Sequence, residues 1–324
     1  MSRHLSRRSA CAVLAAGLVA APAQAQDAFP ARAVRFVNNF PPGGPSDILA
    51  RTLAEALQAS WKQPVVVENK AGAGGNLGAA EVAKAAGDGH TLLFGIDSVV
   101  TVNPHIYKTA LGFRPADLKP VLVMSSSGLL VGVHHATGLK SMKELVAEGR
   151  AKGVTFSSGG NGSPGHLASE QFTEATQARV THVPYRGNTP AVQAVVAGEV
   201  TGGMLATPGM LPHVKSGKVT ALAVTSRQRS RLAPEVPTVA ELGLPQLEQD
   251  VHYLVMAPAS TPDVLVQSIA KAMAEVLQRP EQQARLAQLD MHPEGLMGAT
   301  AAARLAELSA RYARIVKATD MKVD

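Results

Sequence analysis

The sequence predicts an α/β protein with a mainly parallel sheet and helices on both of its faces. Short apolar runs alternate along the chain with loops of small residues and then with segments of helical periodicity, which is the pattern of parallel strands joined by helices. The chain has 324 residues, enough for two domains of ordinary size, and this alternation starts at residue 34 and again at residue 154. We therefore expect two α/β units, with a crevice between them at the carboxyl ends of their strands.

Residues 34–96 make up the first of these units. Three apolar runs in it predict strands, at 34–38, 65–67 and 91–96. Ser46 is expected to be the N-cap of a helix, because its hydroxyl can accept an N–H of the first turn and apolar residues recur behind it at helical spacing. The glycines of residues 72–76 predict a loop that leads into a second helix over 77–86.

The second unit repeats this order from residue 154 onward. Its apolar runs predict strands, at 154–158, 180–183 and 219–225. Helices are expected where helical periodicity follows a loop, over 166–176 and from the end of the loop 184–189 to residue 197. Two amphipathic helices are expected near the carboxyl terminus, over 262–278 and 299–317.

The amino terminus is predicted to be a secretory signal peptide, residues 1–25. It has a basic start, a short apolar run and a small-x-small cleavage pattern, in Arg3, Arg7 and Arg8, then Ala10–Ala21, then Ala23-Gln24-Ala25. The apolar run is too short for a membrane-spanning helix, which needs roughly 20 residues. We expect cleavage near Ala25 and an exported product.

Removal of this leader changes the charge balance and the cysteine content. The whole chain carries 31 Lys and Arg against 25 Asp and Glu, a formal net charge of +6. Three of the arginines lie in the leader, so 28 basic and 25 acidic residues remain, a net charge of +3 without dense basic blocks. The single cysteine, Cys11, also lies in the leader. We expect a soluble exported protein with no nucleic-acid partner, disulfide or cysteine-bound metal.

Two motifs invite an enzymatic interpretation, and neither is complete. Residues 72–78 follow a strand and open a helix like a dinucleotide-binding loop, but Leu77 stands where the third glycine is required. Residues 161–165 resemble the nucleophile elbow of serine hydrolases, but Pro164 follows Ser163 and has no N–H for an oxyanion hole. Ser163 is better explained as a helix cap. Since the histidines also lack metal-ligand spacing, we expect no catalytic residue, no metal and no cofactor.

Four loops are better explained as a binding site for a small anion. Each leads into a predicted helix and carries small residues, at 43–47, 72–76, 159–165 and 186–188. Helix N-termini have unpaired N–H donors and the positive end of the helix dipole, so they favour carboxylates. Neutral hydroxyls stand in or beside these loops, in Ser46, Ser157, Ser158, Ser163, Tyr185 and Thr189. The alternative is that these are ordinary loops of an α/β protein.

Several motifs follow one another in order along the chain after the leader. They are Phe40-Pro41-Pro42-Gly43-Gly44-Pro45-Ser46-Asp47, Val65-Val66-Val67-Glu68-Asn69-Lys70-Ala71-Gly72-Ala73-Gly74-Gly75-Asn76, Asp88-Gly89-His90-Thr91-Leu92-Leu93, Asn103-Pro104, His182-Val183-Pro184-Tyr185-Arg186-Gly187, Ala221-Leu222-Ala223-Val224-Thr225-Ser226, Pro234-Glu235-Val236-Pro237-Thr238 and Ala257-Pro258-Ala259-Ser260-Thr261-Pro262. This ordered set resembles the substrate-binding proteins of tripartite tricarboxylate transporters, the Bug (Bordetella uptake) family. The resemblance covers essentially the whole chain after the leader.

The resemblance implies a periplasmic-binding-protein (Venus-flytrap) fold, with two α/β lobes joined by two crossing strands. Lobe one would comprise residues 27–124 and 251–324, and lobe two residues 125–250. The family's ligands are small organic anions, chiefly di- and tricarboxylates, aromatic carboxylates and some acidic amino acids. The resemblance thus implies a monomeric periplasmic receptor that passes a small carboxylate to the membrane subunits of a transporter.

The resemblance also implies which residues hold the ligand. The loop at 40–47 would bind one carboxylate, largely through backbone groups, and the loops at 157–166, at 185–187 and after Met204 would close over the other end. The expected ligand-binding residues are Phe40, Gly43, Gly44, Ser46, Asp47, Asp97, Ser98, Ser158, Asn161, Ser163, His166, Tyr185, Arg186, Gly187, Ala206 and Thr207.

Residues 205–209 narrow the expected ligand. Many members of the family have an acid-containing Asp-x-x-Pro-Ser stretch there, whereas this chain has Leu205-Ala206-Thr207-Pro208-Gly209. Since that change removes a partner for an ammonium group, we expect a dicarboxylate or aromatic carboxylate without an amine. Two other functions stay open, namely a receptor that presents its ligand to a sensor kinase and an exported hydrolase.

Overall fold

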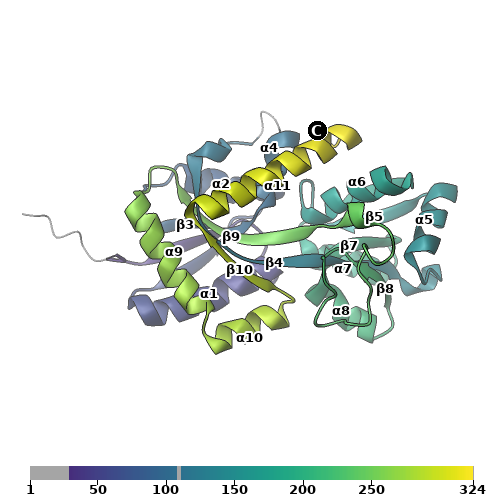
Figure 1. Ribbon diagram of the computed structural model, residues 1–324, viewed down its shortest axis with the longest axis horizontal. Helices are drawn as coiled ribbons and strands as arrows, with labels where there is room; N and C mark the ends of the chain where they lie inside the picture. The colour runs from purple at the N-terminus through teal and green to yellow at the C-terminus, as the bar shows by residue number, and fades with distance from the viewer. Residues whose placement is uncertain (1–28, 108–110, 324) are drawn as a thin grey trace, which may run out of the picture.

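The computed structural model describes residues 29–107 and 111–323, so the predicted leader at 1–25 lies outside the described residues. Two α/β bodies lie side by side in Figure 1, joined by the long strands β4 (Leu118–His134) and β9 (Asp250–Pro258). The carboxyl-terminal helix α11 (Gly298–Thr319) runs over these strands from the first body toward the second.

The first body is built from the amino-terminal strands and covered largely by the carboxyl-terminal helices. Strands β2, β1 and β3 are parallel neighbours in that order, and β9 continues the sheet antiparallel to β3. Its other strands are β1 (Val34–Asn38), β2 (Val65–Asn69), β3 (Thr91–Ile96) and β10 (His292–Met297). Its other helices are α1 (Pro45–Trp61), α2 (Asn76–Ala83), α3 (Ser98–Thr101), α4 (Asn103–Ile106), α9 (Asp263–Leu277) and α10 (Pro280–Gln288). Fully buried side chains such as Phe36, Leu53 and Phe94 form its core.

The second body repeats the arrangement on a smaller scale. Strands β7, β5 and β6 are parallel neighbours, and β4 joins this sheet antiparallel to β7. Its strands are β5 (Val154–Ser158), β6 (Val180–Pro184), β7 (Gly202–Ala206) and β8 (Val219–Val224). Its helices are α5 (Met142–Ala151), α6 (Pro164–Thr176), α7 (Asn188–Ala197) and α8 (Thr207–Lys215).

The two long strands carry the chain between the bodies and correct one prediction. Residues 118–128 of β4 pair with β9, and residues 129–134 pair with β7 and β8 in the other body. All these pairings are antiparallel, so the sheet is mixed rather than mainly parallel. The reason is that β4 carries the chain from the first body into the second and β9 carries it back, so the two long strands run in opposite directions through the sheet.

The predicted elements agree with the structure most closely in the buried strands. Strands at 34–38, 91–96 and 154–158 are confirmed to the residue. Helix α1, by contrast, begins at Pro45 with Gly44 as its N-cap, so the prediction that Ser46 is the N-cap is wrong. Pro45 needs no partner for an N–H and its fixed φ suits the first helical position, so the helix starts there.

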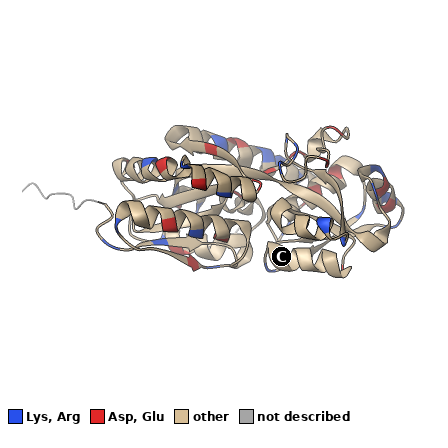
Figure 2. Cartoon of the chain, turned by 90° about the horizontal axis from the view of Figure 1, so that it is seen from below, with Lys and Arg blue, Asp and Glu red and all other residues tan. Residues whose placement is uncertain are grey.

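Charged residues are spread over the outer helices of both bodies. Figure 2 shows Lys and Arg interspersed with Asp and Glu, without a region of one sign. Among the described helices, none is long and apolar enough to span a membrane.

Candidate ligand-binding site

The carboxyl ends of strands from both bodies meet around a cavity of about 100 Å³. Phe40 follows β1, Ile96 ends β3, Gly159 follows β5 and Ala206 ends β7, and all four residues line it. The position agrees with the crevice that open α/β sheets use for ligands. The cavity therefore lies where the sequence predicted a site, between the two α/β units.

Four helices begin at the wall of this cavity. Their N-caps are Gly44 for α1, Ser163 for α6, Gly187 for α7 and Ala206 for α8, and each N-cap lines the cavity. Only Ser163 makes a side-chain capping bond, accepting from the N–H of His166. The other three N-termini lack such a bond, and each has one proline in its first turn, Pro45 in α1, Pro190 in α7 and Pro208 in α8. The remaining first-turn N–H groups can bind an anion, and the four helix dipoles favour negative charge there.

The rest of the cavity wall is apolar and carries no formal charge. Ile96, Leu129, Met204 and Val251 form much of it, and none of the described residues that line the cavity is Lys, Arg, Asp or Glu. Tyr253 also lines it, and burial raises the pKa of its hydroxyl to about 12, so the group stays neutral. The cavity thus combines helix N-termini with an apolar wall, which suits a small organic anion.

Asp47 supports the first loop and does not line the cavity. Its carboxylate accepts hydrogen bonds from the Gly43 amide at 3.0 Å, from Arg51 at 3.1 Å and from the Asn69 amide at 2.8 Å. Burial by itself would raise the pKa of Asp47, but these hydrogen bonds outweigh it and lower the pKa. The carboxylate is therefore ionised and fully engaged in fixing residues 43–47.

Ser158 and His166 support the second loop from behind. The Ser158 hydroxyl lies 2.5 Å from Nε2 of His182, and the rings of His166 and His182 stack with centroids 3.8 Å apart. Nδ1 of His166 accepts from the Gly162 amide at 3.2 Å. Burial and the neighbouring His166 lower the pKa of His182 to about 3, so this ring is neutral at ordinary pH. These groups hold the loop at 159–163 in shape.

The serines of this loop do not form a hydrolase site. Ser158 has a histidine neighbour, as a nucleophile requires, but its side chain is fully buried and also bonded to Gly160. Ser163 caps α6, which confirms the interpretation that it is a helix cap. Within the part of the chain that the structure describes, the side chain of Ser163 makes that capping bond alone, and Nδ1 of His166 accepts from Gly162.

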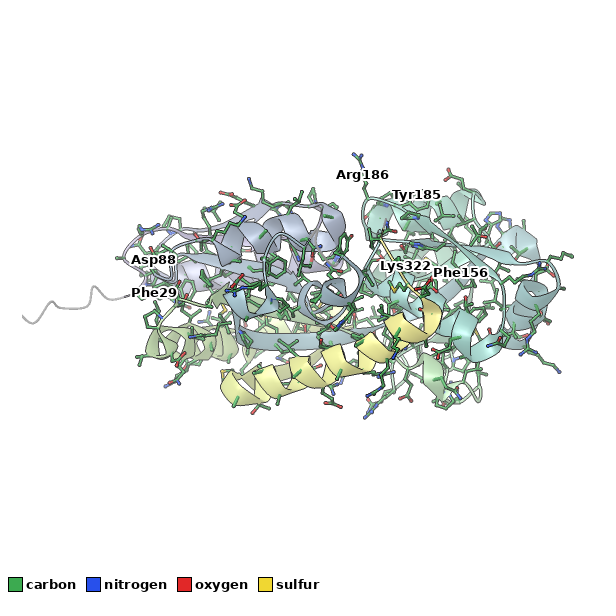
Figure 3. All side chains as sticks on the ribbon, turned by 90° about the horizontal axis from the view of Figure 1, so that it is seen from above. Phe29, Asp88, Phe156, Tyr185, Arg186 and Lys322 are labelled. Carbon is green, nitrogen blue, oxygen red and sulfur yellow. The ribbon has the colours of Figure 1, made fainter. Side chains whose placement is uncertain are left out.

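A second, larger chamber adjoins the first on one side. It has a volume of about 440 Å³ and shares Phe40, Pro41, Gly159 and Gly187 with the first cavity. Three predicted site residues line only this chamber: Asn161, Tyr185 and Arg186. Tyr185 donates its hydroxyl to Glu199 at 3.0 Å. Figure 3 shows the Arg186 side chain pointing away from the molecule, so its guanidinium lies outside the chamber.

The sixteen predicted residues thus fall into distinct places. Six line the first cavity: Phe40, Gly44, Ser46, Ser163, Gly187 and Ala206. Gly43 lines a separate cavity of about 280 Å³ that shares Asn188 and Thr189 with the first. Six line none of these spaces and are buried: Asp47, Asp97, Ser98, Ser158, His166 and Thr207. The sequence did not predict the apolar lining residues, because an apolar residue at a strand end has the same pattern as a residue of the hydrophobic core. Asn188 lies in the predicted loop at 186–188 and lines the cavity, although it was not among the sixteen predicted residues.

Within residues 29–107 and 111–323, no group of three or more His, Cys, Asp or Glu side chains is arranged to hold a metal ion.

Comparison with known proteins identifies the family of this chain. The family model described as "Tripartite tricarboxylate transporter family receptor" matches residues 49–321. The chain belongs to this family. It is also similar to Protein BugT of Bordetella pertussis, with 38% identity over 267 residues that cover 80% of this chain and 80% of BugT. The predicted membership of the Bug family is therefore confirmed.

Solved structures of similar receptors share the fold. R. palustris Rpa4515 with adipate is 30% identical with a TM-score of 0.86, covering 91% of this chain and 99% of that one. MatC (Rpa3494) from Rhodopseudomonas palustris with bound malate is 29% identical with a TM-score of 0.82, covering 89% of this chain and 100% of that one. The predicted periplasmic-binding-protein fold is confirmed, and family and fold are those of solute-binding receptors.

Proposed function

We propose that this receptor binds a small organic carboxylate without an amine in the first cavity and delivers it to the membrane subunits of a tripartite tricarboxylate-type transporter. The observation that carries the proposal is the convergence of four helix N-termini on an uncharged cavity with an apolar wall. Backbone N–H groups and helix dipoles bind a carboxylate without burying a cationic side chain. The adipate and malate of the two related receptors are ligands of this chemical class.

The absence of acidic lining residues supports a ligand without an amine. A buried ammonium group needs a carboxylate or several acceptors as partners. None of the described residues lining the first cavity is Asp or Glu, and the carboxylate of Asp47 is already bonded to Gly43, Arg51 and Asn69. Residues 205–209 supply no acid either.

We further propose that lobe one (27–124 and 251–324) and lobe two (125–250) close around the ligand in the periplasm, as a monomer. The loops of the two bodies touch at the second chamber, since the Tyr107 hydroxyl donates to the Asn161 carbonyl at 3.0 Å. A ligand that contacts N-termini of both lobes favours the closed arrangement, because it gains its full set of contacts only there.

A thermal-shift panel on residues 26–324 tests the ligand class. Adipate, malate, succinate and benzoate are compared with glutamate and aspartate, because a ligand at 100 times its Kd adds about 2.7 kcal/mol of stability. We expect the amine-free acids to raise Tm and calorimetry to rank them above the amino acids. Tighter binding of glutamate or aspartate would contradict the proposal.

An uptake assay separates transport from signalling. A strain lacking this gene should lose uptake of the radiolabelled ligand found in the panel, and the full-length gene should restore it. Normal uptake together with loss of a transcriptional response to the ligand would instead indicate a receptor for a sensor kinase.

A further inference from the structure

The first cavity is lined by two kinds of element, the starts of helices and the strands of both bodies. The strand residues on it are apolar apart from one hydroxyl, and each is at most 6% exposed. They are Ile96 of β3, Leu129 of β4, Met204 and Leu205 of β7, and Val251 and Tyr253 of β9, here called the strand wall. A carboxylate at the helix starts therefore leaves the body of its ligand beside the strand wall.

The pleat of β9 keeps ionisable groups off this wall. Successive side chains of a strand point to opposite faces of the sheet. Val251 and Tyr253 line the cavity, whereas Asp250 and His252 line a separate space beside α11. The face of β9 that meets the ligand cavity is therefore apolar, although the strand carries two ionisable residues beside Val251.

The other polar side chains of the cavity belong to the helix starts. Among the described residues that line it outside the strand wall, four have polar side chains: Ser46 at the start of α1, Ser163 before α6, and Asn188 and Thr189 at the start of α7. Oδ1 of Asn188 already accepts from the Ala206 amide at 3.0 Å, and Ser163 caps α6. These groups lie where the carboxylate is proposed to bind.

Tyr253 contributes the hydroxyl of the strand wall, and this hydroxyl has a protein partner. It lies 3.3 Å from Oγ of Ser127, with either group as the donor. Ser127 is 2% exposed and is not among the residues that line the cavity, so this partner lies outside the cavity. The other side chains of the strand wall are aliphatic or, in Met204, offer only a weak thioether acceptor.

A hydroxyl on the body of the ligand would lose its water beside the strand wall and find no partner to replace it. Burying a hydroxyl without a hydrogen bond is unfavourable, whereas burying a methyl group is favourable. Since the two substituents are of similar size, the strand wall distinguishes them by polarity rather than by bulk.

We propose that the strand wall selects carboxylates with a hydrocarbon body and discriminates against hydroxy acids, and that Val251 is a specificity-determining residue of this wall. The inference rests on the proposed function, in which the carboxylate of the same ligand lies at the helix N-termini. The pleat that turns Asp250 and His252 away also fixes Val251 on the cavity face. The preferred ligand is then an acid whose carbon chain carries no hydroxyl away from the carboxylate.

Two matched series of acids test this selectivity by calorimetry on residues 26–324. Glutarate, 3-methylglutarate and 3-hydroxyglutarate form the dicarboxylate series. Butanoate, 3-methylbutanoate and both enantiomers of 3-hydroxybutanoate form the monocarboxylate series. The members differ only at a carbon that is not bonded to a carboxylate. In the series that binds more tightly, we expect the methyl member to bind about tenfold more tightly than the hydroxyl member, because the buried hydroxyl has no partner.

Variants of β9 give the controls. Val251→Thr keeps the side-chain shape and puts a hydroxyl on the strand wall, so it should reduce the preference for the methyl member to about twofold. Val255→Thr makes the same change at a fully buried position that does not line the cavity, so it should lower the Tm yet keep the preference. Tyr253→Phe should keep the preference as well, because the hydroxyl that it removes is bonded to Ser127.

Four results would overturn the inference. Equal affinity for the methyl and hydroxyl members would do so while the receptor function stands. The wild-type preference in Val251→Thr would remove Val251 from the selection. Weaker binding of the hydroxyl member in Tyr253→Phe, with the methyl member unchanged, would show that the tyrosine hydroxyl serves the ligand. If no member of either series binds, nor adipate, malate, succinate or benzoate, the proposed function itself is wrong and the selectivity falls with it.

Discussion

The ligand cavity and the crossing strands differ in whether they contain ionisable side chains. The cavity is lined by helix N-termini and apolar side chains without a formal charge, whereas the crossing strands bury a cluster of ionisable groups. In that cluster Nδ1 of His252 lies 2.8 Å from Oε1 of Glu294, and the His252 amide donates to Asp97 at 3.0 Å. His252 lies on β9 opposite Ser126 of β4, at the place where the chain passes between the bodies.

The pKa values in this cluster reflect its burial and its pairing. Burial raises the pKa of Asp97. Burial also opposes a charge on His252, but the hydrogen bond to Glu294 and the charges of Asp97 and Glu294 outweigh it and raise the pKa of His252. For Glu294, burial is outweighed by the hydrogen bond from His252, which lowers its pKa. His252 and Glu294 therefore favour their charged forms.

The two regions differ in formal charge because a ligand leaves the cavity, whereas protein groups remain in place. A charge at the cavity would be left unpaired each time the ligand leaves, and a buried unpaired charge is costly. The groups of the crossing strands have other protein groups as partners, so the offset of this cost does not depend on a ligand. A receptor that must release its ligand can therefore place charges in its hinge region and helix dipoles in its binding site.

A charge placed in the cavity should have the largest effect. Ala206→Asp puts a carboxylate at the N-terminus of α8, where it occupies the ligand's place on the helix dipole and repels the ligand. Two like charges about 4 Å apart repel by about 4 kcal/mol at an effective dielectric constant of about 20. We expect calorimetry to show affinity for adipate, or for the best acid of the panel, reduced about 100-fold.

Ala206→Asn is the matched control, because it has the same shape without the charge. We expect it to retain most of the affinity that the Asp variant loses. Equal losses in the two variants would mean that the site excludes bulk at Ala206 and that its charge is unimportant.

Removing a charge from the crossing strands should affect stability and leave affinity unchanged. Glu294→Gln keeps the side-chain shape but takes the negative charge from His252. Breaking a buried pair costs about 3 to 5 kcal/mol, and because Glu294 is partly exposed we expect about 1 to 2 kcal/mol in urea unfolding at pH 6. Calorimetry on the same variant should give the wild-type affinity, and a tenfold change would show that the cluster acts on the binding site.

The pH dependence of the stability lost in Glu294→Gln shows whether the charge pair causes that loss. The raised pKa of His252 adds stability that is complete below its unfolded value, about 6.5, and is lost as the pH rises through the folded value. The lowered pKa of Glu294 adds stability above about 4.5 that is lost as the pH falls. The difference between wild type and Glu294→Gln should therefore be largest between about pH 4.5 and 6.5 and smaller at pH 9. A constant difference would point to packing.

The one capped N-terminus at the cavity should give a smaller effect. Ser163→Ala removes the capping bond of α6, and loss of a Ser cap costs about 1 kcal/mol of stability. Since the loop at 159–163 then loses part of its support, we expect affinity to fall about threefold, measured by calorimetry beside urea unfolding. Ser163→Gly is the control, because Gly replaces a Ser cap at a cost of only a few tenths of a kcal/mol, roughly. Unchanged stability in the Ala variant would contradict the capping role.

The sequence predicted strands most accurately where consecutive residues of the strand are all buried. Strands at 34–38 and 91–96 are short apolar runs between loops, and such runs are a strong signal. The residue pattern did not predict strand β4, because Ser125, Ser126 and Ser127 interrupt its apolar run, although all three are buried by β9 and β10. Two crossing strands were expected only from the family resemblance. A sequence shows which residues are polar, but tertiary pairing decides which of them are buried.

The site was predictable as a set of loops, and the directions of its side chains were not. The loops at 43–47 and 159–165 do surround the cavity, because strand ends and helix starts can be located from the pattern. Asp47 and Ser158 turn inward to hold their own loops, and a polar loop residue looks the same in either role. Tyr253 and Leu129 line the cavity, but no sequence pattern separates an apolar pocket wall from the core.

Arg186 should give the smallest effect and is the sharpest check on an uncharged site. Sequence reasoning placed it among the ligand-binding residues, but its side chain is exposed and points away from the molecule (Figure 3). We expect Arg186→Ala to change affinity for the panel's best acid by less than about twofold at low and high salt. The reason is that solvent and salt screen a charge on an exposed side chain that points away from the ligand. Gly187→Ala is the contrast, since its φ is +112° and a Cβ there would lie 3.0 Å from Pro41. A tenfold loss in Arg186→Ala, reduced by salt, would mean that this guanidinium turns inward onto the ligand, and the contrast between an uncharged cavity and charged crossing strands would then no longer hold.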